Sequence, residues 1–169
     1  MNRDLRVSGK IVTAALVSVV LSACSTVEKS YIDEVVDLPL KSVKVPSESW
    51  KMAPLRANSM YLMYGARTEE EKAGRIGDYY YVRWYDAEPT KPVRLVMRYT
   101  QALTASQELS RTVELTEPRE SAGSQLTKFF FAGDERRKRG DVLSWRMELY
   151  VDGKLQDSSQ SYLWEEPAK

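Results

Sequence analysis

The strongest strand signal in the chain is VLSWRMELYV, residues 142–151. Every second residue of this stretch is apolar and most residues between are polar; the apolar set is Leu143, Trp145, Met147, Leu149 and Val151. Successive side chains of a β-strand point to opposite faces, so the alternation predicts a strand with one buried and one exposed face. We expect the whole apolar set to be buried on one side of a sheet.

The next residues predict that the chain reverses into a second strand. Asp152 and Gly153 form a dipeptide that tolerates the positive φ angles of a tight hairpin turn. A two-residue turn would pair Val151 with Lys154, whereas a loop one residue longer would pair Val151 with Leu155. We favour the longer loop, because it keeps the apolar residues of both strands on the same face.

Similar short strands, separated by Gly- and Pro-containing breaks, recur about every ten residues from residue 59 onward. The candidate strands are Ser59–Tyr64, Asp78–Tyr85, Val93–Thr100, Leu109–Thr116, Gln125–Phe131, Val142–Val151 and Leu155–Trp164. This spacing is typical of an all-β protein with two packed antiparallel sheets. Over residues 59 to 164 the pattern resembles an immunoglobulin or fibronectin type III sandwich of about seven strands, although no cysteine pair is present to bridge the sheets.

The segment before this region is more polar and contains several prolines. We interpret it as a tether that becomes structured toward its end, and we expect residues 25 to about 40 to be poorly packed. Within it, Tyr31–Leu38 is a candidate for one helical turn or more. Val43–Val45, or the piece around Trp50, is a candidate for a first edge strand.

The amino terminus has the three zones of a bacterial export signal. A short basic stretch precedes the apolar run Ile11–Leu21, which is too short to span a bilayer as a permanent helix, since that needs ~20 apolar residues. The run ends in Leu21-Ser22-Ala23-Cys24. This motif resembles the lipobox of bacterial lipoproteins, in which an aliphatic residue and two small residues precede a cysteine.

The lipobox resemblance implies cleavage before Cys24 and attachment of diacylglycerol to its thiol. A multiply acylated cysteine is a durable membrane anchor, because each buried methylene contributes ~0.8 kcal/mol. The resemblance also implies sorting to the outer membrane, because in the enterobacterial rule a residue other than aspartate after the cysteine, here Ser25, directs a lipoprotein there. We therefore divide the chain into a signal peptide (1–23), a lipid-anchored tether (24–57) and a sandwich domain (58–166), and expect the protein in the bacterial envelope, facing the periplasm or the surface.

The composition argues against several functional classes. Loss of residues 1–23 leaves 146 of the 169 residues, with 22 of the 25 Lys and Arg and 23 of the 24 Asp and Glu, so no basic excess suggests a nucleic-acid partner. Histidine is absent, which excludes imidazole-based catalytic triads and removes the commonest zinc ligand. We assign no catalytic residue, metal site or cofactor, and expect a protein that is not an enzyme.

Two surface features are candidates for binding. The segment Gly133–Asp141 places Arg136, Arg137, Lys138 and Arg139 in a row on an expected hairpin tip, where they could bind an anionic partner, although flanking acids nearly neutralise them. The strand Asp78–Tyr85 alternates Tyr80, Val82 and Trp84 with a second aromatic set. That second set, Tyr79, Tyr81 and Tyr85, is a candidate aromatic platform if it is exposed, and otherwise covers the sheet.

Three functions remain compatible with the sequence. The first is a lipid-anchored, non-enzymatic binding or assembly module that contacts an envelope protein, and an exposed apolar patch on a sheet would favour it. The second is a protein that binds a carbohydrate or envelope polymer through exposed Tyr and Trp. The third is a carboxylate-based hydrolase, which would need two carboxylates about 5 to 9 Å apart in a cleft.

Overall fold

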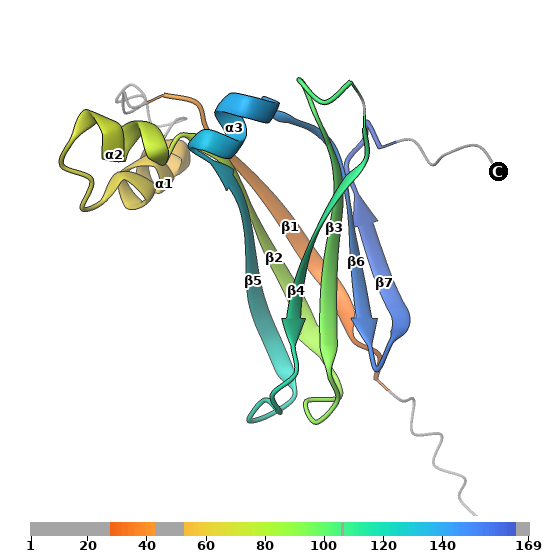
Figure 1. The fold of residues 1–169 in the computed structure, drawn as a ribbon. Coiled ribbons are helices and arrows are strands. Elements are labelled where there is room, and N and C mark those ends of the chain that lie inside the picture. Colours follow the sequence, from red (N-terminus) through yellow and green to blue (C-terminus); the bar gives the residue numbers. More distant parts are fainter. Residues whose placement is uncertain (1–27, 43–52, 106, 165–169) are drawn as a thin grey trace, which may run out of the picture.

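The computed structural model describes residues 28–42, 53–105 and 107–164, and these form two antiparallel sheets (Figure 1). The first sheet has the strand order β1-β2-β5 and the second has the order β4-β3-β6-β7. The strands are β1 (Tyr31–Leu40), β2 (Gly77–Asp86), β3 (Val93–Gln101), β4 (Leu109–Leu115), β5 (Gly123–Ala132), β6 (Val142–Val151) and β7 (Lys154–Gln160); the helices are α1 (Ala53–Met63), α2 (Glu69–Gly74) and α3 (Asp134–Arg139). The predicted two-sheet sandwich of seven strands is confirmed.

The arrangement differs from a constant-type immunoglobulin domain in the place of one strand. In those domains the fourth strand belongs to the first sheet, which then has four strands. Here β4 pairs with β3 along its whole length, from Val93 opposite Leu115 to Tyr99 opposite Leu109. The first sheet therefore ends at β5, and its outer face is only three strands wide.

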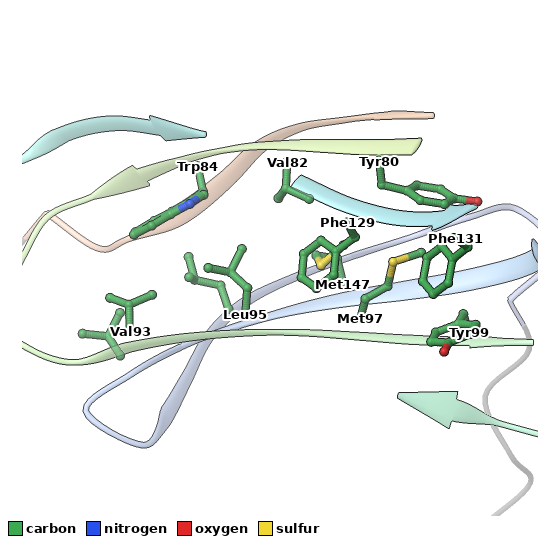
Figure 2. Close-up of a cluster of buried hydrophobic side chains, with 12 residues drawn as sticks. Tyr80, Val82, Trp84, Val93, Leu95, Met97, Tyr99, Phe129, Phe131 and Met147 are labelled. Carbon is green, nitrogen blue, oxygen red and sulfur yellow. The ribbon is translucent and has the colours of Figure 1, made fainter. Parts of the chain in front are cut away.

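The core fills the space between the sheets with alternate residues of four strands (Figure 2). The buried side chains are Tyr80, Val82 and Trp84 of β2, Val93, Leu95, Met97 and Tyr99 of β3, Phe129 and Phe131 of β5, and Met147, Leu149 and Val151 of β6. Each is at most 2% exposed. Large-residue burial of this kind is the main force that holds a domain of this size together, because no disulfide is possible with one cysteine.

The core-facing side chains of β2 are flanked by two buried aspartates, one at each end of the sandwich. Asp86 is fully buried and pairs with Arg119, which comes from the loop between β4 and β5. Asp78, which is 4% exposed, accepts a hydrogen bond from the Val142 N–H at 3.0 Å. The apolar core is thus closed at both ends by carboxylates that hold neighbouring segments.

Strand β1 corrects two expectations about the segment before residue 58. Tyr31–Leu38, considered for a helical turn, is a strand paired with β2 from Tyr31 to Leu40, so the expectation of poor packing is wrong for these residues. The sequence of β1 shows little alternation of apolar and polar residues, because Val35 packs on the core while Val36 faces outward, so both faces of the strand carry apolar residues. The edge-strand candidates Val43–Val45 and the piece around Trp50 lie outside the described residues.

Helix α1 replaces one of the predicted strands. Ser59–Tyr64 was expected to be a strand, and instead Ser59 to Met63 complete α1. The helix leaves Met60 and Tyr61 exposed, as is Tyr64 just after it, whereas Ser59 is buried. A run of Met, Tyr and Leu has no period that separates a strand from a helix, so its length and context decide.

The last hairpin has the register that we did not favour. Asp152 and Gly153 form a two-residue turn with φ of 50° and 74°, and Val151 pairs with Lys154. The ladder then shifts by one residue, so that Leu149 lies opposite Asp157, and Leu155 is left 50% exposed. The preference of Asp-Gly for a tight turn outweighs the match of apolar faces, and a bulge absorbs the difference.

A second bulge, at the start of β6, explains the exposure of one residue that was expected to be buried. Thr100 pairs with Ser144 but Gln101 pairs with Val142, so Leu143 is the extra residue and is 52% exposed. Met147, Leu149 and Val151 are buried as predicted, and Trp145 is partly buried and packs against the core. The alternation therefore predicts β6 correctly except where the backbone bulges.

The three helices gather at one end of the sandwich, where β1 ends (Figure 1). The strand begins at the opposite end, near the turn between β6 and β7, and the Ile32 N–H donates to the Asp157 carboxylate at 2.8 Å. This contact joins the edges of the two sheets. Within the described ranges, no helix has the length and apolar content needed to cross a bilayer.

Candidate functional site

The three tyrosines of the predicted platform lie on the outer face of the first sheet. Tyr79, Tyr81 and Tyr85 alternate along β2 with the buried residues of the core, and all three are half-buried. Strand alternation is sufficient to place them there. The sequence did not show what lies beside them.

Two of these rings pack against aromatic neighbours on adjacent strands. Tyr85 stacks on Tyr31 of β1, with ring centroids 5.4 Å apart and an interplanar angle of 15°. Tyr79 stacks on Phe130 of β5 at 6.4 Å and 21°. Each ring therefore uses one of its faces for a partner within the sheet, as cross-strand aromatic pairs do.

The hydroxyl groups of the same two tyrosines are also engaged. Tyr79 donates to the Arg75 carbonyl at 2.6 Å, and Tyr85 donates to the Glu28 carboxylate at 3.1 Å. Burial also raises the pKa of Tyr79 above its usual value. Tyr79 and Tyr85 are thus held in place as parts of the sheet surface.

Tyr81 instead lines a shallow groove of about 470 Å³ between α1 and the outer face of the first sheet. The lining is mostly aliphatic and aromatic, and it comes from three strands and one helix: Val36, Leu38, Ala57, Asn58, Tyr61, Tyr81, Leu126 and Lys128. Tyr61 is 65% exposed and Leu126 is 59% exposed. We call this set of eight residues the groove.

Most of the groove was missed by sequence reasoning. Val36 and Leu38 lie in a segment that we took for a tether, and Tyr61 in one that we took for a strand. The one available signal was the adjacent pair Val35 and Val36, because apolar residues on both faces of a strand indicate that the outer face has a role.

Lys128 lies opposite Tyr81 on the neighbouring strand β5. Its ammonium group is 5.4 Å from the centre of the Tyr81 ring and 5.9 Å from that of Tyr61. Such distances are within the range of cation–π attraction. Among the described residues, no carboxylate forms an ion pair with Lys128.

The basic segment Arg136–Arg139 belongs to a short helix and not to an open loop. Helix α3 has Asp134 and Glu135 in its first turn and the four cations after them, the order that the helix dipole favours. Arg137 pairs with Asp134, and Arg139 lies 3.8 Å from Glu135. Of the four cations, only Lys138 lacks an ion pair within the described part of the chain.

Arg136 forms ion pairs at one end of the core. Its guanidinium pairs with Asp141 and lies 3.8 Å from the buried carboxylate of Asp78. Burial raises the pKa of Asp78, although the Val142 N–H and Arg136 act to lower it. Arg136 therefore compensates an internal charge.

Metal binding has no arranged site in the part of the chain that the structure describes. No group of three or more Cys, Asp or Glu side chains converges there in a way that could hold a metal ion. Thr68 and Glu71 form the capping box at the start of α2, so the Glu71 carboxylate is already used by the backbone. Cys24, the predicted lipidation site, lies outside the described residues.

Fold and site together define a seven-stranded antiparallel β-sandwich whose first sheet presents an apolar groove beside paired aromatic rings. No protein-family model matches the chain, and neither a curated protein nor a solved structure matches it.

Proposed function

We propose that the protein is a lipid-anchored, non-enzymatic binding module of a bacterial envelope that docks a protein partner in the groove. The observation that supports this proposal is the groove itself, with Tyr61 and Leu126 exposed on its rim. Exposed apolar surface around a concavity is typical of interaction sites, and Tyr is among the residues that contribute most to protein interfaces. The rigid sheet beneath the groove reduces the ordering cost of binding.

The composition of the groove supports a protein partner over a polysaccharide. Sugar rings bind on flat, exposed aromatic faces, whereas Tyr79 and Tyr85 already stack on their neighbours. The aliphatic part of the lining is Val36, Leu38 and Leu126, which are suited to an apolar side chain. The carbohydrate alternative therefore has less support from this site.

The position of β1 is compatible with an anchor at one end and binding at the other. Cys24 precedes the first described residue, Glu28, by four positions, and the chain between them spans at most about 14 Å. Strand β1 then runs for ten residues, about 33 Å, toward the helical end. A lipid on Cys24 would hold the start of β1 close to the membrane and the groove farther from it.

Replacement of Cys24 by alanine should release the protein from the membrane or leave it unprocessed. The native protein is expected in the membrane fraction with the mass of acyl chains on Cys24, because one thiol carries the whole anchor. Membrane fractionation and intact-mass spectrometry of the protein from its native host measure this. Ser25→Ala is the matched control, since it keeps the lipobox and should stay membrane-bound. A native protein that is water-soluble and unacylated would contradict the anchor.

A photoreactive amino acid at Leu126 should crosslink to a discrete partner in the native host. The same amino acid at Thr112, an exposed position of β4 on the second sheet, should not. Tyr81→Ala is expected to reduce the Leu126 crosslink by about tenfold or more, because a central tyrosine contributes strongly to an interface. Equal crosslinking at both positions, or no effect of Tyr81→Ala in a variant that still folds, would argue against docking in the groove.

A further inference from the structure

Charge in the groove is confined to a single residue. Of the eight residues that line it, Lys128 is a cation and none is an acid. The other polar groups of the lining are the Asn58 amide and the tyrosine hydroxyls. An incoming ligand therefore meets an apolar surface with one positive charge at its side.

Lys128 differs from the neighbouring cation on the same face of the sheet. Arg83, one row away on β2, is bound by Asp33 at 2.5 Å and by Glu34 at 2.7 Å, so its charge is already compensated. Lys128 has no such partner among the described residues and is held between the rings of Tyr61 and Tyr81. Aromatic faces orient an ammonium group but leave its N–H donors available.

We propose that the groove binds a peptide segment of a partner protein in which an apolar side chain lies next to an Asp or Glu. The apolar side chain would pack on Val36, Leu38 and Leu126, and the carboxylate would accept hydrogen bonds from the Lys128 ammonium. This inference rests on the proposed function, since it names the chemistry of the partner at the same site. A single cation is matched by a single carboxylate.

The groove is open and shallow, so an extended peptide can pass along it. The carboxylate that binds Lys128 therefore belongs to an Asp or Glu side chain within the peptide and not to its carboxyl terminus. A hydrogen-bonded ion pair of this kind strengthens binding mainly where neighbouring apolar contacts exclude water. Tyr61 and Leu126, which line the groove and are exposed, provide those contacts. The preference should therefore be for acidic and apolar residues together, and not for acidity alone.

The test selects peptides from a random library displayed on phage against the acylated full-length mature protein in detergent micelles. A peptide that represents the consensus is then synthesised with an amidated carboxyl terminus, so that only side-chain carboxylates remain. Its Kd is measured for the native protein, for Lys128→Gln and for Lys138→Gln. Lys138 is the matched control, because it is an exposed cation of α3 outside the groove and has no ion pair with any residue that the structure describes.

We expect the selected peptides to share an apolar residue beside Asp or Glu. Lys128→Gln should weaken binding by at least about fivefold and Lys138→Gln by less than twofold. Replacing the peptide's Glu by Gln should weaken binding to the native protein but not to Lys128→Gln, because the two changes remove the same contact. Failure to select any peptide, or a consensus without an acid, would overturn the proposal.

Further variants separate this proposal from the function on which it rests. If Tyr81→Ala abolishes peptide binding while Lys128→Gln leaves it unchanged, the groove is a docking site but the acidic partner is wrong. If neither variant affects the selected peptides, they bind elsewhere, and docking in the groove fails as well.

Discussion

Replacing Asp86 by alanine is expected to lower the free energy of unfolding by about 3–5 kcal/mol, the usual cost of removing one partner from a buried ion pair. Asp86 is fully buried and pairs with Arg119, whose side chain is 12% exposed. Arg119 also donates to the carbonyls of Glu88 at 3.1 Å and Lys91 at 2.7 Å, so it is held in place and cannot easily turn to solvent. Urea denaturation of the purified domain measures the loss.

An exposed ion pair supplies the control for this variant. Arg83→Ala removes the contacts with Asp33 and Glu34 and should cost no more than about 1 kcal/mol, because both sides are solvated. The double variant Asp86→Ala with Arg119→Ala should cost less than the sum of the two single ones. An Asp86→Ala variant as stable as Arg83→Ala would show that the ion pair between Asp86 and Arg119 does not hold the β4–β5 loop against the β2–β3 loop.

Trp84→Ala is expected to destabilise the domain by about 3–5 kcal/mol, the range for removing a buried aromatic side chain. Trp84 is 0% exposed and is the largest of the fully buried side chains, so its loss leaves a cavity between the sheets (Figure 2). Its indole N–H also donates to the Thr127 hydroxyl at 3.1 Å. The midpoint of urea denaturation should fall with little change in slope.

Two variants define how this result is interpreted. Tyr162→Ala removes a fully exposed aromatic ring and should change stability by less than about 0.5 kcal/mol. Trp84→Phe keeps most of the apolar volume and loses the hydrogen bond to Thr127, so its cost should lie between those of the other two. A Trp84→Ala cost near that of Tyr162→Ala would mean that the sheets close over the gap.

Alternation of side chains was sufficient to predict β2, β3 and most of β6, because these strands have one core face, and the spacing of Gly and Pro breaks predicted β5. The predicted platform followed from the same rule. Because Tyr80, Val82 and Trp84 face the core, the alternate residues Tyr79, Tyr81 and Tyr85 must lie on the outer face of β2. The rule fails where a bulge adds a residue, as at Leu143, and the preference for a tight turn overrides it at the last hairpin. Such local backbone choices are not encoded in apolar periodicity.

The groove could not be predicted because it is assembled from distant segments. Val36 of β1, Tyr61 of α1 and Lys128 of β5 meet only after β1 and β5 pair with the two sides of β2. The basic segment presented the opposite difficulty. Its four adjacent cations are conspicuous in the sequence, yet Arg136 is directed to Asp78, a residue 58 positions earlier that forms part of the core end.

The placement of β1 also determines how the domain would respond to a mechanical pull. The outer face of β1 carries Val36 and Leu38 at the groove. With the proposed anchor at Cys24 and the proposed partner in the groove, tension between membrane and partner would run along this strand. Hydrogen bonds between antiparallel strands are perpendicular to the strands, and a pull along β1 loads its bonds to β2 together, in shear. Strands loaded in this way must break many bonds at once, whereas a pull across them would open the bonds one after another. The resistance of the domain to force would then depend on the rate of unfolding under tension and not on its equilibrium stability.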